Sequence, residues 1–95
     1  MDIQSVRHRA LRSSLETGHG KGLDARLIGR LRNMVALIHA ANDAGELRVP
    51  PNFGFHWLTG DRAGAASMTV TKNWRMTFKV STDNEIVDLD LEDCH

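Results

Sequence analysis

The chain has 95 residues, 41% hydrophobic and 25% charged, which fits one globular domain over residues 1–95 and excludes a fibrous or wholly disordered chain. Twelve basic residues balance twelve acidic ones, which argues against a protein that holds nucleic acid by bulk charge alone. The single cysteine, Cys94, excludes an internal disulfide, and no apolar run reaches the length of a membrane span, so we expect a cytoplasmic protein without a membrane partner.

The balanced total hides a difference between the two halves of the chain. Residues 1–48 carry eight basic and five acidic residues, and residues 49–95 carry four basic and seven acidic ones. The first half therefore has a net charge of +3 and the second half of −3.

The first elements in chain order are a short extended segment and a short helix. Residues 2–6 alternate in polarity and could form a small edge strand. Residues 8–17 predict a helix, because Leu11 and Leu15 stand one turn apart. Glycines at positions 18, 20 and 22 then favour a loop.

A second helix is the clearest element of the sequence. Six apolar residues follow helical spacing, namely Leu27, Ile28, Leu31, Met34, Val35 and Ile38. Asp24 is expected to be the N-cap or an acid of the first turn, and residues 42–45 are expected to end the helix. Pro50 and Pro51 mark the change to another class of structure.

The period of the hydrophobic pattern then becomes two, which is typical of β-strands. The predicted strands cover residues 53–57, 67–71, 74–80 and 87–92, and turns are expected at 72–73 and 81–84. The predicted fold class is therefore α+β, with an N-terminal helical pair packed on one face of a twisted antiparallel sheet.

The third predicted strand has one apolar and one polar face. Trp74, Met76, Phe78 and Val80 should face the helices, and Arg75, Thr77 and Lys79 should face away from them. Arg75 and Lys79 could form an anion-binding site, and Asp88 or Asp90 of the next strand could equally pair with them. Arg75 is thus either a cross-strand salt-bridge partner or a ligand anchor.

Six short segments together resemble one known family. They are Arg7-His8-Arg9-Ala10-Leu11, Glu16-Thr17-Gly18, Arg30-Leu31-Arg32, the run from Phe55 to Asp61, the run from Lys72 to Phe78, and Glu92-Asp93-Cys94-His95. On these residues the chain resembles HigB-type toxins of the RelE superfamily, which are small bacterial ribonucleases that cut messenger RNA on the ribosome. The resemblance covers nearly the whole chain.

The resemblance implies a small RelE-like fold whose sheet binds mRNA in the ribosomal decoding region. In that family a 2′-hydroxyl attacks the adjacent phosphate and leaves a 5′-hydroxyl fragment, without a metal or another cofactor. It further implies a HigA-like helix-turn-helix antitoxin as a partner, and contact with operator DNA only through that antitoxin.

Site residues follow from the same resemblance. His56 matches a family histidine expected to act as a base or an electrostatic partner, and Arg75 matches an arginine expected to hold the scissile phosphate bidentately. Asp93 and His95 match the C-terminal catalytic positions, and His95 is the better acid–base candidate. The cations expected to bind RNA around them are Lys72, Lys79 and Arg62.

Two positions depart from the family pattern. Thr59 stands where the family often has lysine, and Cys94 where it often has tyrosine. The first change removes a cation from the phosphate site, and the second removes an aromatic surface on which a base could stack. An alternative hypothesis follows, a RelE-fold module that binds antitoxin and ribosome but cleaves weakly or not at all.

Other interpretations of these residues stay open. His56 taken alone would be an exposed or structural histidine. Arg7, Arg9 and Arg12 form either a solvated face or a contact with ribosomal RNA backbone. The five histidines and one cysteine lack the spacing of common zinc motifs, so we expect no metal site.

Overall fold

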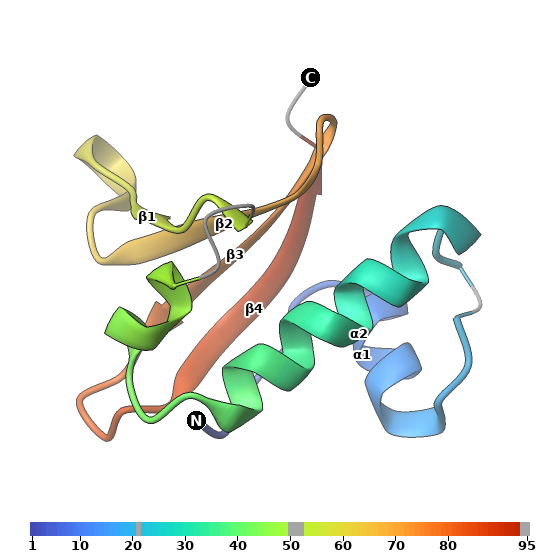
Figure 1. Cartoon of the computed structure of the whole chain (residues 1–95), viewed down its shortest axis with the longest axis horizontal. Helices are drawn as coiled ribbons and strands as arrows, with labels where there is room; N and C mark the ends of the chain where they lie inside the picture. Colours follow the sequence, from blue (N-terminus) through green and yellow to red (C-terminus); the bar gives the residue numbers. More distant parts are fainter. Residues whose placement is uncertain (21, 50–52, 94–95) are drawn as a thin grey trace.

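The computed structural model describes residues 1–20, 22–49 and 53–93, in which two helices precede an antiparallel sheet (Figure 1). The elements are α1 (Arg9–Thr17), α2 (Ala25–Ala40), the 3-10 helix η1 (Ala44–Arg48), β1 (His56–Trp57), the 3-10 helix η3 (Gly60–Arg62), β2 (Ala65–Thr71), β3 (Trp74–Val80) and β4 (Ile86–Asp93). The strand order is β1-β2-β3-β4, and each neighbouring pair is antiparallel. These elements confirm the predicted α+β class. Among the helices of the described ranges, none has the length and apolar character needed to cross a membrane.

Helix α1 ends at the predicted Thr17 and begins one residue after the predicted start, and local hydrogen bonds fix both of its ends. His8 is the N-cap, and its Nδ1 accepts a hydrogen bond from the Leu11 N–H at 3.1 Å. Gly18 ends the helix with φ +78° and donates its N–H to Ser14 O at 2.8 Å. Leu11 is buried, but Leu15 is 41% exposed, so only one of the two predicted apolar positions enters the core.

Helix α2 crosses one face of the sheet (Figure 1). Asp24 caps it as predicted, with Oδ1 accepting from the Arg26 N–H at 2.9 Å. Five of the six predicted apolar positions are buried, and Ile28 is half-buried. At the other end, η1 follows at residues 44–48, a turn that the sequence did not predict, and it buries Leu47 completely.

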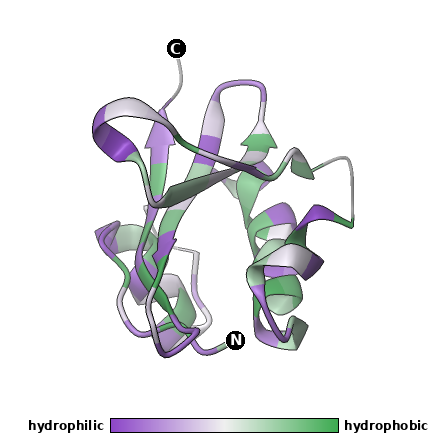
Figure 2. Ribbon diagram, turned by 90° about the vertical axis from the view of Figure 1, so that its left-hand side faces the viewer, coloured by the Kyte–Doolittle hydropathy of each residue, from purple (hydrophilic) through white to green (hydrophobic). Residues whose placement is uncertain are grey.

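The core lies between α2 and the apolar face of β2–β4. Met34 and Ile38 of the helix join Met68, Met76 and Phe78 of the strands in one buried cluster. Figure 2 shows hydrophobic and hydrophilic residues alternating along the strands, as a sheet with one packed face requires. Val80 and Trp74 are only partly buried at the ends of β3, where the helix covers the sheet less completely.

Strand β1 has two residues, whereas a strand over residues 53–57 was predicted. Gly54 has φ +56°, which takes the backbone out of the extended conformation before His56. Phe53 turns into the core instead and is 9% exposed. The predicted start of β2 at residue 67 is also late, because Ala65 and Ala66 already pair with β3.

Strand β4 contains an extra residue that the alternating pattern does not reveal. Lys79 pairs with Val87 and Thr77 with Asp90, so two residues of β4 lie opposite Phe78 alone. Asp88 takes φ +55° there, the left-handed conformation of a β-bulge. Ile86 rather than the predicted Val87 therefore enters the core at the start of the strand.

The positive φ of Asp88 determines which side chains this position tolerates. A β-branched side chain is strained at positive φ, whereas glycine is not. We expect Asp88→Val to lower the free energy of unfolding by about 1–2 kcal/mol more than Asp88→Gly. Urea unfolding of the two variants measures the difference, and equal unfolding free energies would argue against the positive φ.

Residues before α1 run along the outer edge of β4. Ile3 and Val6 form single parallel bridges with Ile86 and Leu89. The backbone N–H of Gln4 donates to Ile86 O at 2.7 Å. The predicted small edge strand is thus reduced to two bridges, and Arg7 lies between this segment and α1.

Candidate functional site

The sheet face turned away from α2 carries most of the predicted site. Paired residues of adjacent strands present their side chains on the same face. One row runs from His56 through Ser67 and Thr77 to Asp90, and the next contains Arg75 opposite Glu92. The Ser67 and Thr77 side chains are buried, although they point away from the main core. The register therefore brings His56 and Arg75 to one face, two strands or about 10 Å apart in the pairing direction.

Glu92 lies at the centre of the polar contacts on this face. Its two carboxylate oxygens accept hydrogen bonds from Nη1 and Nη2 of Arg62 at 2.8 and 2.6 Å. Oε1 also accepts from Arg75 Nη2 at 3.3 Å, and Oε2 accepts from the Thr77 hydroxyl. Arg75 thus pairs with Glu92, which corrects the predicted alternative of a pair with Asp88 or Asp90. Guanidinium groups from η3 and β3 meet on one carboxylate.

The electrostatic state of Glu92 follows from these bonds. The hydrogen bonds from Arg62 lower its pKa from 4.5 to about 2, and those from Thr77 and Arg75 act in the same direction against the effect of burial. The same contact raises the pKa of Arg62. Glu92 is therefore ionised at neutral pH, and the cluster of Arg62, Arg75 and Glu92 carries one net positive charge.

The lowered pKa of Glu92 should make the free energy of unfolding depend on pH in the acid range. Because the folded pKa of Glu92 lies below its unfolded value, its contribution to stability is full above about pH 4.5 and is lost as the pH falls toward 2. We expect the unfolding free energy of the wild type to fall more steeply over this window than that of Glu92→Gln. Parallel slopes in denaturant titrations at several pH values would contradict the assigned contacts.

His56 is exposed on β1 and has a defined tautomer. Its Nδ1 lies 3.1 Å from the carbonyl oxygen of Gly54, and a carbonyl can only accept, so Nδ1 carries the hydrogen. In the neutral ring, Nε2 is then the unprotonated nitrogen. A histidine held in this way can accept a proton from a group placed on the open side of the sheet.

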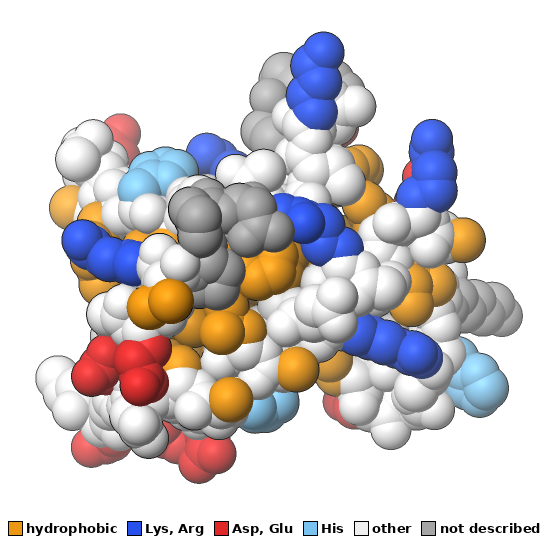
Figure 3. All heavy atoms as spheres, viewed as in Figure 1, with side chains coloured by type: hydrophobic (Ala, Val, Ile, Leu, Met, Phe, Trp, Pro, Cys, Tyr) orange, Lys and Arg blue, Asp and Glu red, His pale blue; other side chains and the backbone are white. Residues whose placement is uncertain are grey.

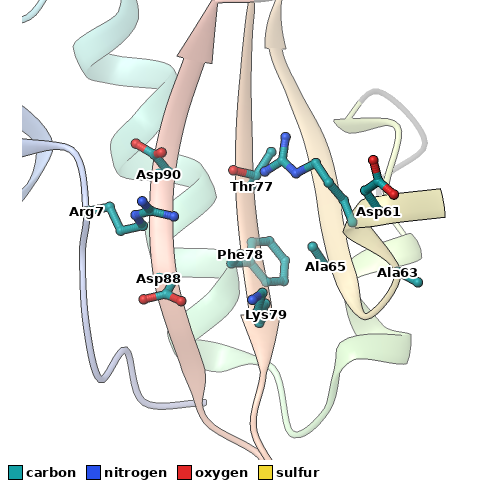
Figure 4. A pocket seen from close by; sticks show the side chains of 10 residues that line it. Arg7, Asp61, Ala63, Ala65, Thr77, Phe78, Lys79, Asp88 and Asp90 are labelled. Carbon is teal, nitrogen blue, oxygen red and sulfur yellow. The ribbon is translucent and has the colours of Figure 1, made fainter. Parts of the chain in front are cut away.

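A shallow hollow of about 150 Å³ lies beside this row. Figure 4 shows Lys79 on β3, Asp88 and Asp90 on β4, and Arg7 between these two carboxylates. Arg62 and Asp61 close the hollow from the η3 side. The predicted cations Lys79 and Arg62 therefore both lie on this face, together with Arg7, which the sequence had not connected with the site.

The other predicted site residues lie elsewhere or outside the described ranges. Lys72 is in the exposed β2–β3 turn, next to a hollow that Asp24 and Trp74 also line. Asp93 pairs with Trp74, so the strand alternation places it on the opposite face of β4 from Glu92. His95 and Cys94 fall outside the described residues. Thr59 is the N-cap position of η3 and makes no side-chain capping bond.

The face that carries α2 has a different chemical character. Figure 3 shows apolar side chains in the middle of this face, basic side chains around them and acidic ones gathered at the lower left. Two arginines stack over aromatic rings: Arg30 lies 4.7 Å from the centroid of Phe53, and Arg48 lies 5.6 Å from that of Phe55. Trp57 remains 41% exposed next to Phe55.

Sequence reasoning missed Glu92 as a site residue. Its position two residues after Asp90 placed it on the polar face, which was the available signal. Its pairing with Arg75 depends on the bulge at Asp88, because without the extra residue Arg75 would lie opposite Leu91. Within the described part of the chain, no three histidine, cysteine or acidic side chains are grouped as metal ligands.

Solved structures define the class of this fold. YafQ from Escherichia coli BL21(DE3) superposes with a TM-score of 0.62 at 14% identity, covering 98% of this chain and 94% of its own. A YoeB/ParE toxin from Agrobacterium tumefaciens superposes with a TM-score of 0.60 at 18% identity, covering 97% and 99%. At these identities the likeness concerns the fold alone, which this chain shares with YafQ and the YoeB/ParE toxin.

The sequence comparisons place the chain within that class. Residues 4–95 match the family of RelE-like toxins of the type II toxin–antitoxin system HigB, and the chain belongs to this family. The Endoribonuclease HigB of Proteus vulgaris is 34% identical over 93 residues, which make up 98% of this chain and 99% of the relative. The predicted family and the predicted enzyme class, an endoribonuclease, are confirmed by these matches.

Proposed function

We propose that this toxin cuts messenger RNA on the ribosome, and that the sheet face with His56, Arg75 and Glu92 receives the scissile phosphate. The observation that carries the proposal is the meeting of two guanidinium groups, from Arg62 and Arg75, on one anionic group, on the same sheet face as the exposed His56. A site that holds a carboxylate in this way has the donors that a phosphate requires.

The reaction that fits these groups is attack of a 2′-hydroxyl on the adjacent phosphate. His56 Nε2 accepts the hydroxyl proton, and Arg75 donates to the phosphate oxygens as negative charge accumulates on them. The leaving 5′-oxygen takes a proton from an acid, for which His95 is the candidate. Asp93 lies on the opposite face of β4 from Glu92, so it is assigned an indirect, supporting role at the C-terminal end of the strand. Lys72, Lys79 and Arg62 are assigned to the RNA backbone. All these steps are performed by side chains, and the proposal includes no cofactor.

The partners follow from the family. A toxin of a type II system is paired with an antitoxin, and one structural relative was solved as the Escherichia coli DinJ–YafQ toxin–antitoxin complex. We propose a HigA-like helix-turn-helix antitoxin, through which alone the toxin contacts operator DNA. The ribosome, its mRNA and a cytoplasmic location complete the proposal, in which residues 1–95 act as one toxin domain.

Cleavage of an end-labelled mRNA by the purified protein, with and without programmed ribosomes, tests this function. We expect cuts that require ribosomes and leave 5′-hydroxyl ends, which a kinase can label directly. Ribosome binding without cleavage would favour the alternative, a non-catalytic module, to which Thr59 in place of a lysine points. Cuts of equal rate without ribosomes would contradict ribosome dependence.

A further inference from the structure

The arginines assigned to the RNA phosphate are already engaged in the free protein. Both terminal nitrogens of Arg62 donate to Glu92, and Arg75 donates to the same carboxylate through Nη2. The Nε atom of Arg75 is buried, and no described residue accepts a hydrogen bond from it. A phosphate approaching this site therefore meets two guanidinium groups that already hold a carboxylate.

We propose that Glu92 is an internal competitor of the RNA phosphate, and that its carboxylate must leave Arg62 before the site can bind RNA. This inference rests on the proposed function, because that function makes RNA the ligand of the site. Glu92 would then determine the preference for ribosome-held over free RNA.

The geometry explains why the carboxylate can imitate the phosphate. A guanidinium group presents two parallel N–H bonds that fit two oxygens of either anion. Both carboxylate oxygens of Glu92 accept hydrogen bonds from Arg62, at 2.8 and 2.6 Å. The buried Thr77 hydroxyl donates a further hydrogen bond to one of them. The register completes the arrangement, because it places Glu92 directly opposite Arg75.

Concentration explains why the competitor prevails in the free protein. A group tethered beside its partner acts at an effective concentration of about millimolar or higher. Dilute mRNA offers its phosphates at far lower concentration, and this chain has no net positive charge to attract them. On the ribosome, mRNA and toxin are held by further contacts, so the phosphate is itself tethered and can displace Glu92.

The surface position of the contact makes displacement feasible. The Arg62 side chain is 44% exposed and lies on the short helix η3, so it can swing toward solvent without unpacking the core. Glu92 is 22% exposed on the same face. Release of the pair removes only hydrogen bonds that water or phosphate can replace.

Binding of an uncleavable RNA tests the proposal without any catalytic step. The probe is a fluorescent 2′-O-methyl oligoribonucleotide, and its anisotropy is followed at low salt with the full chain. Glu92→Gln should bind about tenfold more tightly than the wild type. The matched control is Asp90→Asn, which removes one carboxylate from the same face of β4, where Asp90 accepts from the Leu91 N–H and has no direct bond to Arg62 or Arg75. Equal gains in the two variants would overturn the competition.

Two further variants separate competition from general charge. Glu92→Asp keeps the charge but shortens the reach to Arg62, so it should also strengthen binding, which a purely electrostatic effect would not do. In an Arg62→Ala background, Glu92→Gln should give no more than the Asp90→Asn gain. Unchanged binding by Glu92→Asp, or a full gain without Arg62, would contradict the proposal, and thermal melts confirm that each variant is folded.

The RNA-binding experiment and the ribosome cleavage assay can fail independently of each other. If Glu92→Gln binds the probe more tightly but the wild type does not cleave on ribosomes, the catalytic proposal fails and the competition stands. If the wild type cleaves on ribosomes but Glu92→Gln and Asp90→Asn bind alike, the competition alone fails.

Discussion

Replacement of Arg75 by alanine is expected to slow mRNA cleavage on ribosomes by about 10²–10³-fold, with little loss of stability. Arg75 projects from the middle of the sheet, where β2 and β4 flank its strand on both sides. Its guanidinium group is therefore held at a fixed position, as stabilisation of developing charge on a phosphate requires. The side chain is about one-third exposed, so its loss opens no cavity in the core.

Arg75→Lys provides the matched control, because it retains the charge and loses the fork of donors. We expect single-turnover cleavage by the lysine variant to lie between those of the wild type and the alanine variant. Full activity of Arg75→Ala, with wild-type ribosome binding, would remove Arg75 from the mechanism. Urea unfolding of both variants verifies that the sheet is intact.

Loss of the His56 imidazole should reduce the cleavage rate by about 10²–10⁴-fold, the range for removal of a general base. The hydrogen bond of Nδ1 to Gly54 O leaves Nε2 as the basic nitrogen, and the ring is exposed on the two-residue strand β1. His56→Ala therefore removes a proton acceptor without removing a core contact.

The control for His56→Ala is His19→Ala, which deletes an exposed imidazole in the loop after α1. The two variants should have equal stability and differ only in cleavage. Added imidazole should restore part of the activity of His56→Ala, since a small base can occupy the space left by the ring. Equal cleavage by the two alanine variants would mean that another group takes the proton.

Much of the fold could be predicted because local rules determine it. The apolar stripe from Leu27 to Ile38 and the Asp24 cap define α2 without reference to distant residues. The turn at residues 72–73 likewise sets β3 against β2. Both signals depend on neighbours in sequence, which a single chain displays directly.

The site could be predicted only in part, because it depends on register. Period-two alternation predicted that Arg75, Thr77 and Lys79 share a face, but not which acid meets Arg75. The positive φ of Asp88 shifts β4 by one residue and brings Glu92 to that position. No propensity rule signals such a bulge in a run of alternating acidic and apolar residues. The contribution of Arg7 was missed for a similar reason, since it depends on the chain before α1 running beside β4.

The bridges of Ile3 and Val6 to β4 also bear on how the protein behaves at high concentration. An unpaired strand edge exposes amide and carbonyl groups to which a second chain can add. Here the first half of the outer edge of β4, an eight-residue strand, is covered by the segment before α1, which bridges to Ile86 and Leu89. The opposite edge belongs to β1, which offers only two residues. Among the described residues, the exposed strand edge is thus limited to the end of β4 and the two residues of β1, which leaves a short template for edge-to-edge aggregation.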